Sequence, residues 1–223
     1  MSDYVGKGAV IWESNNMMYL RTFTRGHGPA RVSGMRLDVE AKQWGRVDVA
    51  PLRDYIAGRG AEVWHFKCPV RALEDCTRII LRHSRDYNFD FDDIIDWPLM
   101  DEFRPYVQPV VDAVCAAVGK SRVSALFIAN LPAGKNILPH VDSGDFLAIP
   151  SRVHVPLKTN PGVRYHIGGV YIEDERPDKM SAQKFAKKFH MAEGEIWEID
   201  NMSCHSVENA GAGDRWHLVV NIW

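Results

Sequence analysis

From Arg122 to its end, the chain consists of short β-rich runs separated by turn-forming residues. Proline, glycine and asparagine punctuate the sequence, for example at residues 131–134 and 160–162. Many short strands divided by such turns are typical of an antiparallel sandwich or barrel. The sequence therefore predicts a mainly β fold with flanking helices, whose predicted strands in this half are residues 122–130, 137–142, 151–158, 163–173, 195–200, 203–208 and 214–223.

The clearest helix signal lies just before this β-rich half, over residues 101–118. Acidic residues occupy the predicted first turn, where the positive end of a helix dipole favours them. Gly119 follows the last residue of the pattern, as is typical of a helix end. The apolar residues recur at helical spacing and predict a buried stripe that packs on a sheet, made of Phe103, Val107, Val110, Val111, Val114 and Val118.

The rest of the first half has a mixed pattern. Residues 51–57, with proline in the first turn, predict a short helix, and residues 69–82 predict a second one. We expect strands at residues 9–13, 31–39 and 62–67. The acidic residues between 86 and 102 are interpreted as a solvated loop that leads into the long helix, and residues 174–189 as an exposed excursion that could cover the mouth of a site.

The composition is that of a globular protein, with 46% hydrophobic and 25% charged residues. A formal net charge of −2 gives no electrostatic reason to expect nucleic acid or an anionic membrane as a partner. No apolar stretch is long enough to span a bilayer, and we find no signal peptide. The four cysteines form no CxxC pair, which favours free thiols in a reducing compartment, so we expect a cytoplasmic protein.

Three residues of the β-rich half match the ligand set of a non-haem iron centre. His140 and Asp142 are two residues apart on a predicted strand, so they share a face, with Cα atoms about 6–7 Å apart. That pair alone occurs often by chance, and a surface histidine and aspartate are its default interpretation. With His205 as a third ligand, the set matches the two-histidine, one-carboxylate triad that holds Fe(II) and leaves positions open. The neighbouring Cys204 is expected to be buried and to face away from the metal.

Arg215 points to an anionic cosubstrate. Residues 203–208 and 214–223 flank a glycine-containing loop, and a simple hairpin register sets His205 opposite Arg215, on the same face. An arginine inside a barrel is costly unless an anion meets it. An internal salt bridge is the alternative, but a dicarboxylate such as 2-oxoglutarate would supply the anion through paired hydrogen bonds.

A second polar pair lies at Arg152 and His154, which share one face of a predicted strand while Val153, Val155 and Leu157 share the other. If this strand lines the same cavity, the pair adds positive and hydrogen-bonding groups around the metal. The alternative is a solvent-facing polar face on a half-exposed strand.

Several of these motifs together resemble the aspartyl/asparaginyl β-hydroxylase family, in particular a bacterial branch that includes cis-hydroxylases of free proline. The resemblance covers about residues 120–223. It is carried by His140-Val141-Asp142, by Arg-Val-His-Val-Pro-Leu at 152–157, by His-Met-Ala-Glu-Gly-Glu-Ile-Trp at 190–197, by His205 and by Arg-Trp-His-Leu at 215–218.

The resemblance implies a double-stranded β-helix, the cupin-like jelly roll, in a single dioxygenase domain spanning residues 1–223. Residues 121–223 would form its metal- and cosubstrate-binding core, and residues 1–120 a mixed support region. It implies Fe(II) held by His140, Asp142 and His205. It also implies 2-oxoglutarate on the iron, with its distal carboxylate on Arg215 and its other end close to His154.

The resemblance implies further roles around this centre. Arg152 would lie beside the cosubstrate or the substrate's own carboxylate, and His217 is a candidate for a supporting position. The family's 2-oxoglutarate-binding serine aligns near Ala129 here, so we expect Asn130 or Ser124 to replace that contact.

The implied reaction uses O2 to convert 2-oxoglutarate to succinate and CO2 and to hydroxylate an unactivated C–H bond. Related halogenating enzymes need a vacant ligand position, which Asp142 fills here, so hydroxylation is predicted. The short chain has no evident peptide-binding module, which favours a free, amino-acid-like small molecule as substrate. The sequence carries no feature that specifies an oligomeric state.

Three alternatives remain open at this point. The enzyme could hydroxylate an aspartyl, asparaginyl or prolyl residue in a polypeptide. The same three ligands could hold zinc in a cupin-type metalloenzyme that has no use for 2-oxoglutarate, although such an enzyme would not need Arg215. The chain could also be a sensor that binds 2-oxoglutarate without turning it over.

Overall fold

A computed structural model describes residues 41–64, 66–142, 144–168 and 187–223 of the chain. It also describes the backbone of the short strands β1 (Val5–Gly6), β2 (Ala9–Ser14), β3 (Met17–Thr22), β12 (Tyr171–Ile172) and β13 (Ser181–Ala182). The strand predicted at residues 9–13 is confirmed by β2. The strand predicted at 31–39 and most of the excursion predicted at 174–189 lie outside the described residues.

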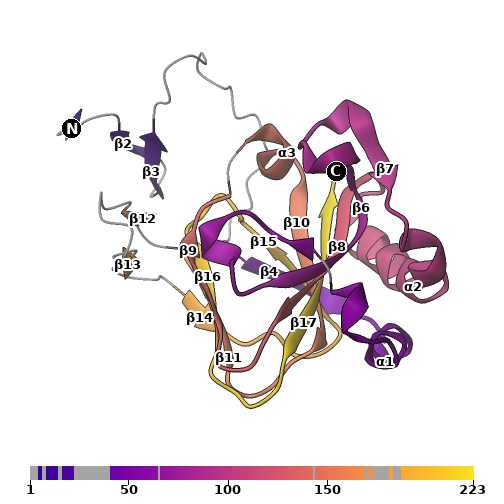
Figure 1. Cartoon of the computed structure of the whole chain (residues 1–223). Coiled ribbons are helices and arrows are strands. Elements are labelled where there is room, and N and C mark those ends of the chain that lie inside the picture. The colour runs from indigo at the N-terminus through magenta and orange to yellow at the C-terminus, as the bar shows by residue number, and fades with distance from the viewer. Residues whose placement is uncertain are drawn as a thin grey trace.

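Two antiparallel sheets form the body of the fold (Figure 1). The larger sheet has the order β4 (Ala41–Arg46), β15 (Glu195–Ile199), β10 (Ser151–Lys158), β17 (Arg215–Ile222), β8 (Val123–Leu131), β6 (Thr77–Ser84) and β5 (Phe66–Lys67), with β7 (Ile94–Asp96) paired to β6. The smaller sheet has the order β14 (Lys187–Phe189), β11 (Val163–Ile167), β16 (His205–Asn209) and β9 (Asn136–His140).

From β8 to β11 and from β15 to β17, successive strands alternate between the two sheets. This alternation brings the sheets face to face and winds the chain into a jelly roll. The predicted double-stranded β-helix is therefore confirmed. The strands predicted between residues 122 and 223 are all present in the described residues, but the run at 163–173 is divided into β11 and β12.

Two helices cover the face of the larger sheet that points away from the smaller one (Figure 1). They are α1 (Ala50–Ala57) and α2 (Met100–Val118), and both agree with the predicted helices. The buried stripe of α2 packs into an apolar cluster with residues of the sheet's outer face, including Val153, Val155 and Leu157 of β10. These two valines and one leucine point outward, so Arg152 and His154 point inward, as their alternation predicts.

A second apolar cluster fills the space between the sheets at one end. It joins Leu131 of β8 and Ile199 of β15 to Ile167 of β11 and Val207 of β16. Because this cluster occupies only part of the interior, the remaining space between the sheets is left for polar side chains, and the site described below lies there.

The helix predicted at residues 69–82 is wrong. A short 3-10 turn, Arg71–Leu73, is followed by β6, which runs from Thr77 to Ser84 and pairs with β8. The spacing of Leu73, Cys76, Ile79 and Ile80 fits a helix, but Thr77, Ile79 and Ile80 are β-branched and favour a strand when a neighbouring strand is available. The strand predicted at 62–67 is likewise mostly replaced by a 3-10 turn, Ala61–Val63, before the two-residue β5.

The end of α2 yields a test of the fold. Gly119 has φ +70, and a Cβ placed there would meet no atom within 4 Å, so only backbone strain opposes a side chain. We expect Gly119→Ala to lower the free energy of unfolding by about 1 kcal/mol, measured by urea denaturation. Gly58, which ends α1 with φ −78, is the matched control, since Gly58→Ala meets only ordinary contacts and should cause no loss. Equal effects of the two substitutions would contradict this account.

Candidate metal and cosubstrate site

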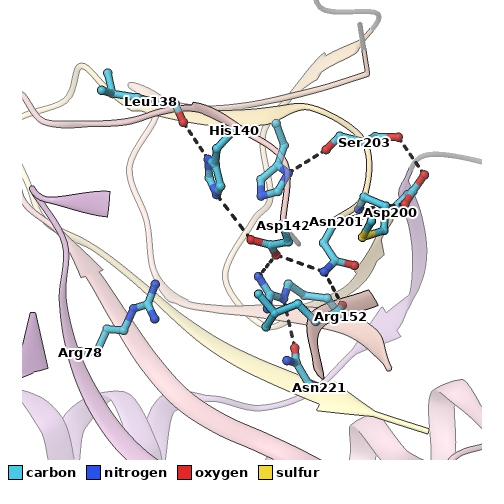
Figure 2. A network of polar contacts seen from close by, with 12 residues as sticks. Arg78, Leu138, His140, Asp142, Arg152, Asp200, Asn201, Ser203 and Asn221 are labelled. Atoms are coloured by element: carbon cyan, nitrogen blue, oxygen red, sulfur yellow. Dashed lines mark hydrogen bonds and ion pairs between the residues drawn. The ribbon is translucent and has the colours of Figure 1, made fainter. Parts of the chain in front are cut away.

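The three predicted metal ligands meet at one point between the sheets. His140 ends β9 and His205 begins β16, and the two residues are direct partners in the antiparallel register. Asp142 follows two residues after His140, and its backbone N–H donates to the carbonyl of Asn201. One potential ligand atom from each of the three side chains lies within 4.8 Å of the others, and Figure 2 shows His140 and Asp142 facing the same space.

Hydrogen bonds orient all three side chains for a metal. Nδ1 of His140 lies 2.8 Å from the Leu138 carbonyl, and Nδ1 of His205 lies 2.9 Å from the Ser203 carbonyl. A carbonyl only accepts, so each Nδ1 carries the proton and each Nε2 keeps a lone pair. Asp142 uses Oδ2 to accept from Arg152 and from Asn201, while its Oδ1 lies 3.8 Å from Nε2 of His140. The free Oδ1 and the two Nε2 atoms fit a facial Fe(II) site.

Burial and charge keep these ligands in the forms that a metal requires. Burial lowers the pKa of His140, and it lowers the pKa of His205 to about 3. Burial is the largest single influence on Asp142 and would by itself raise its pKa. The Arg152 guanidinium, His205, His140 and the hydrogen bond from Asn201 together outweigh burial and hold that pKa well below its usual range. The site is therefore two neutral imidazoles and one carboxylate at neutral pH, and no proton needs to leave before a metal binds.

Arg152 connects the metal-facing carboxylate to the larger sheet. It donates to Asp142, and its Nε donates to Oδ1 of Asn221 at 3.1 Å (Figure 2). Asn221 is its direct partner on β17. These contacts fix the orientation of Asp142, and they also neutralise the charge of Arg152 within the protein. His154, two residues further on β10, lines the same cavity, and neither of its ring nitrogens has a partner among the described residues.

Arg215 lies in the same cavity and is 1% exposed. Its Nη2 lies 2.7 Å from Nδ1 of His217, its Nε is buried without a partner, and no acidic side chain pairs with it in the part of the chain that the structure describes. The pKa of His217 lies well below its usual value, chiefly because of burial, so its ring is neutral and Nδ1 accepts from Arg215. The internal salt bridge considered for Arg215 is thus absent from the described residues.

The cavity has a volume of about 170 Å³ and is lined by both sheets. Tyr165 of β11 also lines it, and its buried hydroxyl has no partner among the described residues. The Tyr165 and His205 rings are parallel, with centroids 6.1 Å apart. The cavity thus contains the buried guanidinium of Arg215, the imidazole of His154 and the phenol of Tyr165, each with a hydrogen-bonding group that has no partner among the described residues. Such a set of groups fits a ligand that bears carboxylates.

The hairpin predicted between His205 and Arg215 does not form. β16 pairs with β11 and β9, whereas β17 pairs with β10 and β8, so the intervening loop passes from one sheet to the other. Both side chains nevertheless line one cavity, because the inner faces of the two sheets oppose each other. The shared cavity was predicted, but the register that led to it was wrong.

Asn130 and Ser124 do not line the cavity. Arg215, His217 and Asn221 pair with Leu131, Ala129 and Ala125 on β8, so the odd-numbered β8 residues face inward. Asn130 pairs with Trp216 and therefore faces the helices, where it cannot take over the contact of the family's serine. Ser124 instead lies near the carbonyl of Asn221, to which its hydroxyl donates at 3.4 Å.

Four residues of the site were not predicted from the sequence. Tyr165 and Asn201 lie on or beside predicted strands, and the alternation of the Val-Arg-Tyr-His-Ile run of β11 would have placed Tyr165 on one face with Val163 and Ile167. Arg78 was not found because residues 69–82 were assigned to a helix, and His83 directly follows that segment on the same strand, β6.

The sequence profile of the aspartyl/asparaginyl beta-hydroxylase family matches residues 100–223, which is more than half of the chain. The chain belongs to this family. The predicted class of enzyme is thereby confirmed: it is an oxygenase that hydroxylates its substrate, with Fe(II) as cofactor and 2-oxoglutarate as cosubstrate. No curated protein matches the chain.

Two solved structures with a similar fold are distant from this chain in sequence. An oxidoreductase of the 2OG-Fe(II) oxygenase family from Burkholderia pseudomallei is 14% identical, with a TM-score of 0.49 over 76% of each chain. A prolyl-4-hydroxylase from Pseudomonas putida is 13% identical, with a TM-score of 0.46 over 82% of this chain and 91% of that one. Similarity at this level carries no information about the substrate.

The helices that the structure describes include none with the length and apolar character needed to cross a membrane.

The buried histidines predict a steep dependence of stability on pH. Burial lowers the pKa of His83 to about 4 and of His205 to about 3, and it lowers those of His140, His154 and His217. The unfolded chain binds these protons near pH 6.5, whereas the folded metal-free chain does not, so stability is lost as the pH falls below about 6.5. Each such histidine should contribute about 1 kcal/mol to the loss between pH 7 and pH 5.5.

The measurement is urea unfolding of the metal-free protein across this pH range. His83→Gln removes one of these groups and should make the pH dependence shallower by about one proton, whatever its effect on stability at pH 7. A stability that stays constant from pH 7 to pH 5.5 would contradict the burial of neutral histidines.

Proposed function

We propose that this protein hydroxylates an unactivated C–H bond of a free, amino-acid-like small molecule, with release of succinate and CO2 from 2-oxoglutarate. The observation that carries the proposal is the arrangement of one cavity. His140, Asp142 and His205 converge at one point of it, and the buried Arg215, which has no acidic partner among the described residues, lines it as well. A metal triad explains the first group, and a dicarboxylate cosubstrate explains the second.

We assign the iron to Nε2 of His140, Oδ1 of Asp142 and Nε2 of His205. These are the atoms that the hydrogen bonds to Leu138, Ser203, Arg152 and Asn201 leave free. Bound Fe(II) would supply the site at which dioxygen is activated. The role of the protein is to hold these three ligands in a fixed geometry, and the contacts of Arg152 and Asn201 to Asp142 serve this purpose.

We assign the distal carboxylate of 2-oxoglutarate to Arg215. The unpartnered Nε and the guanidinium nitrogens offer parallel N–H donors, the arrangement that a carboxylate binds best. His217 holds the guanidinium from behind by accepting from Nη2. The Tyr165 hydroxyl and the His154 ring have free hydrogen-bonding groups in the same cavity and are assigned to the oxygens of the cosubstrate.

The size of the cavity supports a small substrate. Its volume of about 170 Å³ lies below the roughly 300–1,000 Å³ of pockets that take drug-sized ligands. Because 2-oxoglutarate would occupy part of this space, the room that remains beside the metal ligands suits a compact group.

We further propose that residues 1–223 form one dioxygenase domain. Two strands from the first half of the chain, β4 and β6, lie in the same sheet as β8, β10 and β17, and this continuity supports a single domain over a separate support region.

The central test is succinate release from 2-oxoglutarate by the purified protein with Fe(II) and ascorbate, against a panel of free amino acids and of short peptides containing Asp, Asn or Pro. We expect a free amino acid to stimulate succinate formation and to gain one oxygen atom, detected by mass spectrometry. His140→Ala should abolish this turnover, because the metal loses one of three protein ligands.

Cys204→Ser is the matched control, since Cys204 adjoins His205 in sequence but does not line the cavity. It should keep the wild-type rate. Stimulation by the peptides alone would overturn the substrate class, and absence of succinate from iron-loaded protein under every condition would overturn the proposed reaction.

A further inference from the structure

Arg78 faces the metal ligands from the opposite side of the cavity. It lies on β6, where its register partner is Ala129 of β8, which in turn pairs with His217 of β17. These three residues therefore share the inner face of the larger sheet. Figure 2 shows the Arg78 guanidinium directed at the space in front of His140 and Asp142, with no dashed line to any other drawn residue. Ala129, which has a small side chain, lines the same cavity.

The charge of Arg78 is buried without an acidic partner. The side chain is 7% exposed, its Nη1 donates to the Tyr87 hydroxyl at 2.5 Å, and its guanidinium lies 4.7 Å from the centre of the Phe127 ring. Its Nε has no partner, and no ion pair to Arg78 occurs in the part of the chain that the structure describes. A buried guanidinium in this state costs free energy until an anion binds it.

Once the proposed cosubstrate is bound, Arg78 is the arginine of the cavity that still lacks an anionic partner. Three arginines line the cavity, namely Arg78, Arg152 and Arg215, whereas Asp142 is the one carboxylate among the described lining residues. Asp142 pairs with Arg152. One carboxylate of 2-oxoglutarate is assigned to Arg215, and the other belongs at the metal. A further anion is therefore needed to neutralise Arg78.

A strained aromatic loop borders this arginine. Tyr87 and Phe89 have positive φ values of 58° and 61°, which non-glycine residues rarely adopt. The loop is held by the Phe89 N–H, which donates to Oγ of Ser84 at 2.8 Å, and by the face-to-face stacking of Tyr87 on His83 at 3.9 Å. Both aromatic side chains line the cavity, and Phe89 is 41% exposed at its edge.

A β-bulge in β6 contributes to this wall. Ile80 pairs with Phe127, but Arg82 rather than Leu81 pairs with Leu126. The extra residue shifts the alternation by one, so that His83 joins Arg78 on the inner face and Arg82 turns outward to pair with Asp96. The backbone is thus shaped to place an apolar wall beside a buried positive charge.

We infer that Arg78 binds the carboxylate of the substrate, and that the substrate is a small organic acid whose carbon chain packs against Tyr87 and Phe89. This inference rests on the proposed function. It makes Arg78 a specificity-determining residue: the carboxylate is held on β6, across the cavity from the metal ligands, and one C–H bond of the chain is presented to them.

The test compares acids with their carboxamides. Stimulation of succinate release is measured for the standard free amino acids and for the matching amino-acid amides, with wild type, Arg78→Met and Arg78→Lys. Wild type should prefer the acid over its amide by at least about 100-fold in kcat/KM, and Arg78→Met should lose most of this preference by losing turnover of the acid. Arg78→Lys keeps the positive charge but lacks the paired N–H donors of a guanidinium, and it should show an intermediate preference for the acid over its amide.

Two measurements separate this role from others. Arg82→Met is the matched control, because Arg82 lies on the same strand but faces outward, and it should keep the wild-type preference. Thermal stabilisation of the Mn(II)-loaded protein by 2-oxoglutarate should survive in Arg78→Met and be lost in Arg215→Met. Loss of this stabilisation in Arg78→Met would make Arg78 a cosubstrate residue and overturn the inference.

Failure of the inference about Arg78 can be distinguished from failure of the proposed function. If wild type binds 2-oxoglutarate and forms succinate but no free acid is preferred over its amide, the inference fails and the proposed reaction stands. If wild type neither binds 2-oxoglutarate nor forms succinate, the proposed function fails and the inference with it. An unchanged acid preference in Arg78→Met also overturns the inference.

Discussion

The site is organised by buried positive charge that the protein does not neutralise. Arg215 lies between the two sheets, almost fully buried, and its one described hydrogen-bonding neighbour is the neutral ring of His217. Burial lowers its pKa to about 10, which leaves the guanidinium charged at neutral pH. An enclosed cation of this kind is tolerated only if a ligand supplies the anion, so a preference for a carboxylate is built into the folded state.

Unlike Arg215, the metal ligands have their charge balanced by other groups of the protein. Asp142 is paired with Arg152, and the imidazoles of His140 and His205 are neutral through burial. The jelly roll makes both arrangements compatible, because the smaller sheet carries the two histidines and the larger sheet carries the arginines. The metal ion and the dicarboxylate cosubstrate would thereby bind in adjoining parts of one cavity. The chemistry of the family then requires only that a substrate be held beside them, a task that the residues of β6 and the loop after it are placed to perform.

Alternation and turn residues were sufficient to predict where the strands of the second half lie. They also predicted which side chains share a face, because β10 is buried on both faces but still places Arg152 and His154 on one side and Val153 and Val155 on the other. The same local patterns could not decide which strands pair. His205 and Arg215 were predicted to share a hairpin, whereas they belong to different sheets, and this choice depends on contacts with β9, β11 and β8 that are distant in sequence. Arg78 was missed for a related reason. Residues 69–82 fit a helical spacing, and only pairing with β8 makes residues 77–84 a strand and turns Arg78 into the cavity.

The most direct measurement of the central claim is calorimetric binding of 2-oxoglutarate to the Mn(II)-loaded protein in wild type and Arg215→Met. If the buried guanidinium is the partner of the distal carboxylate, the substitution should weaken binding by at least about 30-fold while Mn(II) still binds. Arg164→Met is the control, since Arg164 donates to backbone carbonyls at the surface of β11 and should leave the affinity unchanged. Equal affinity of wild type and Arg215→Met for 2-oxoglutarate would contradict the account.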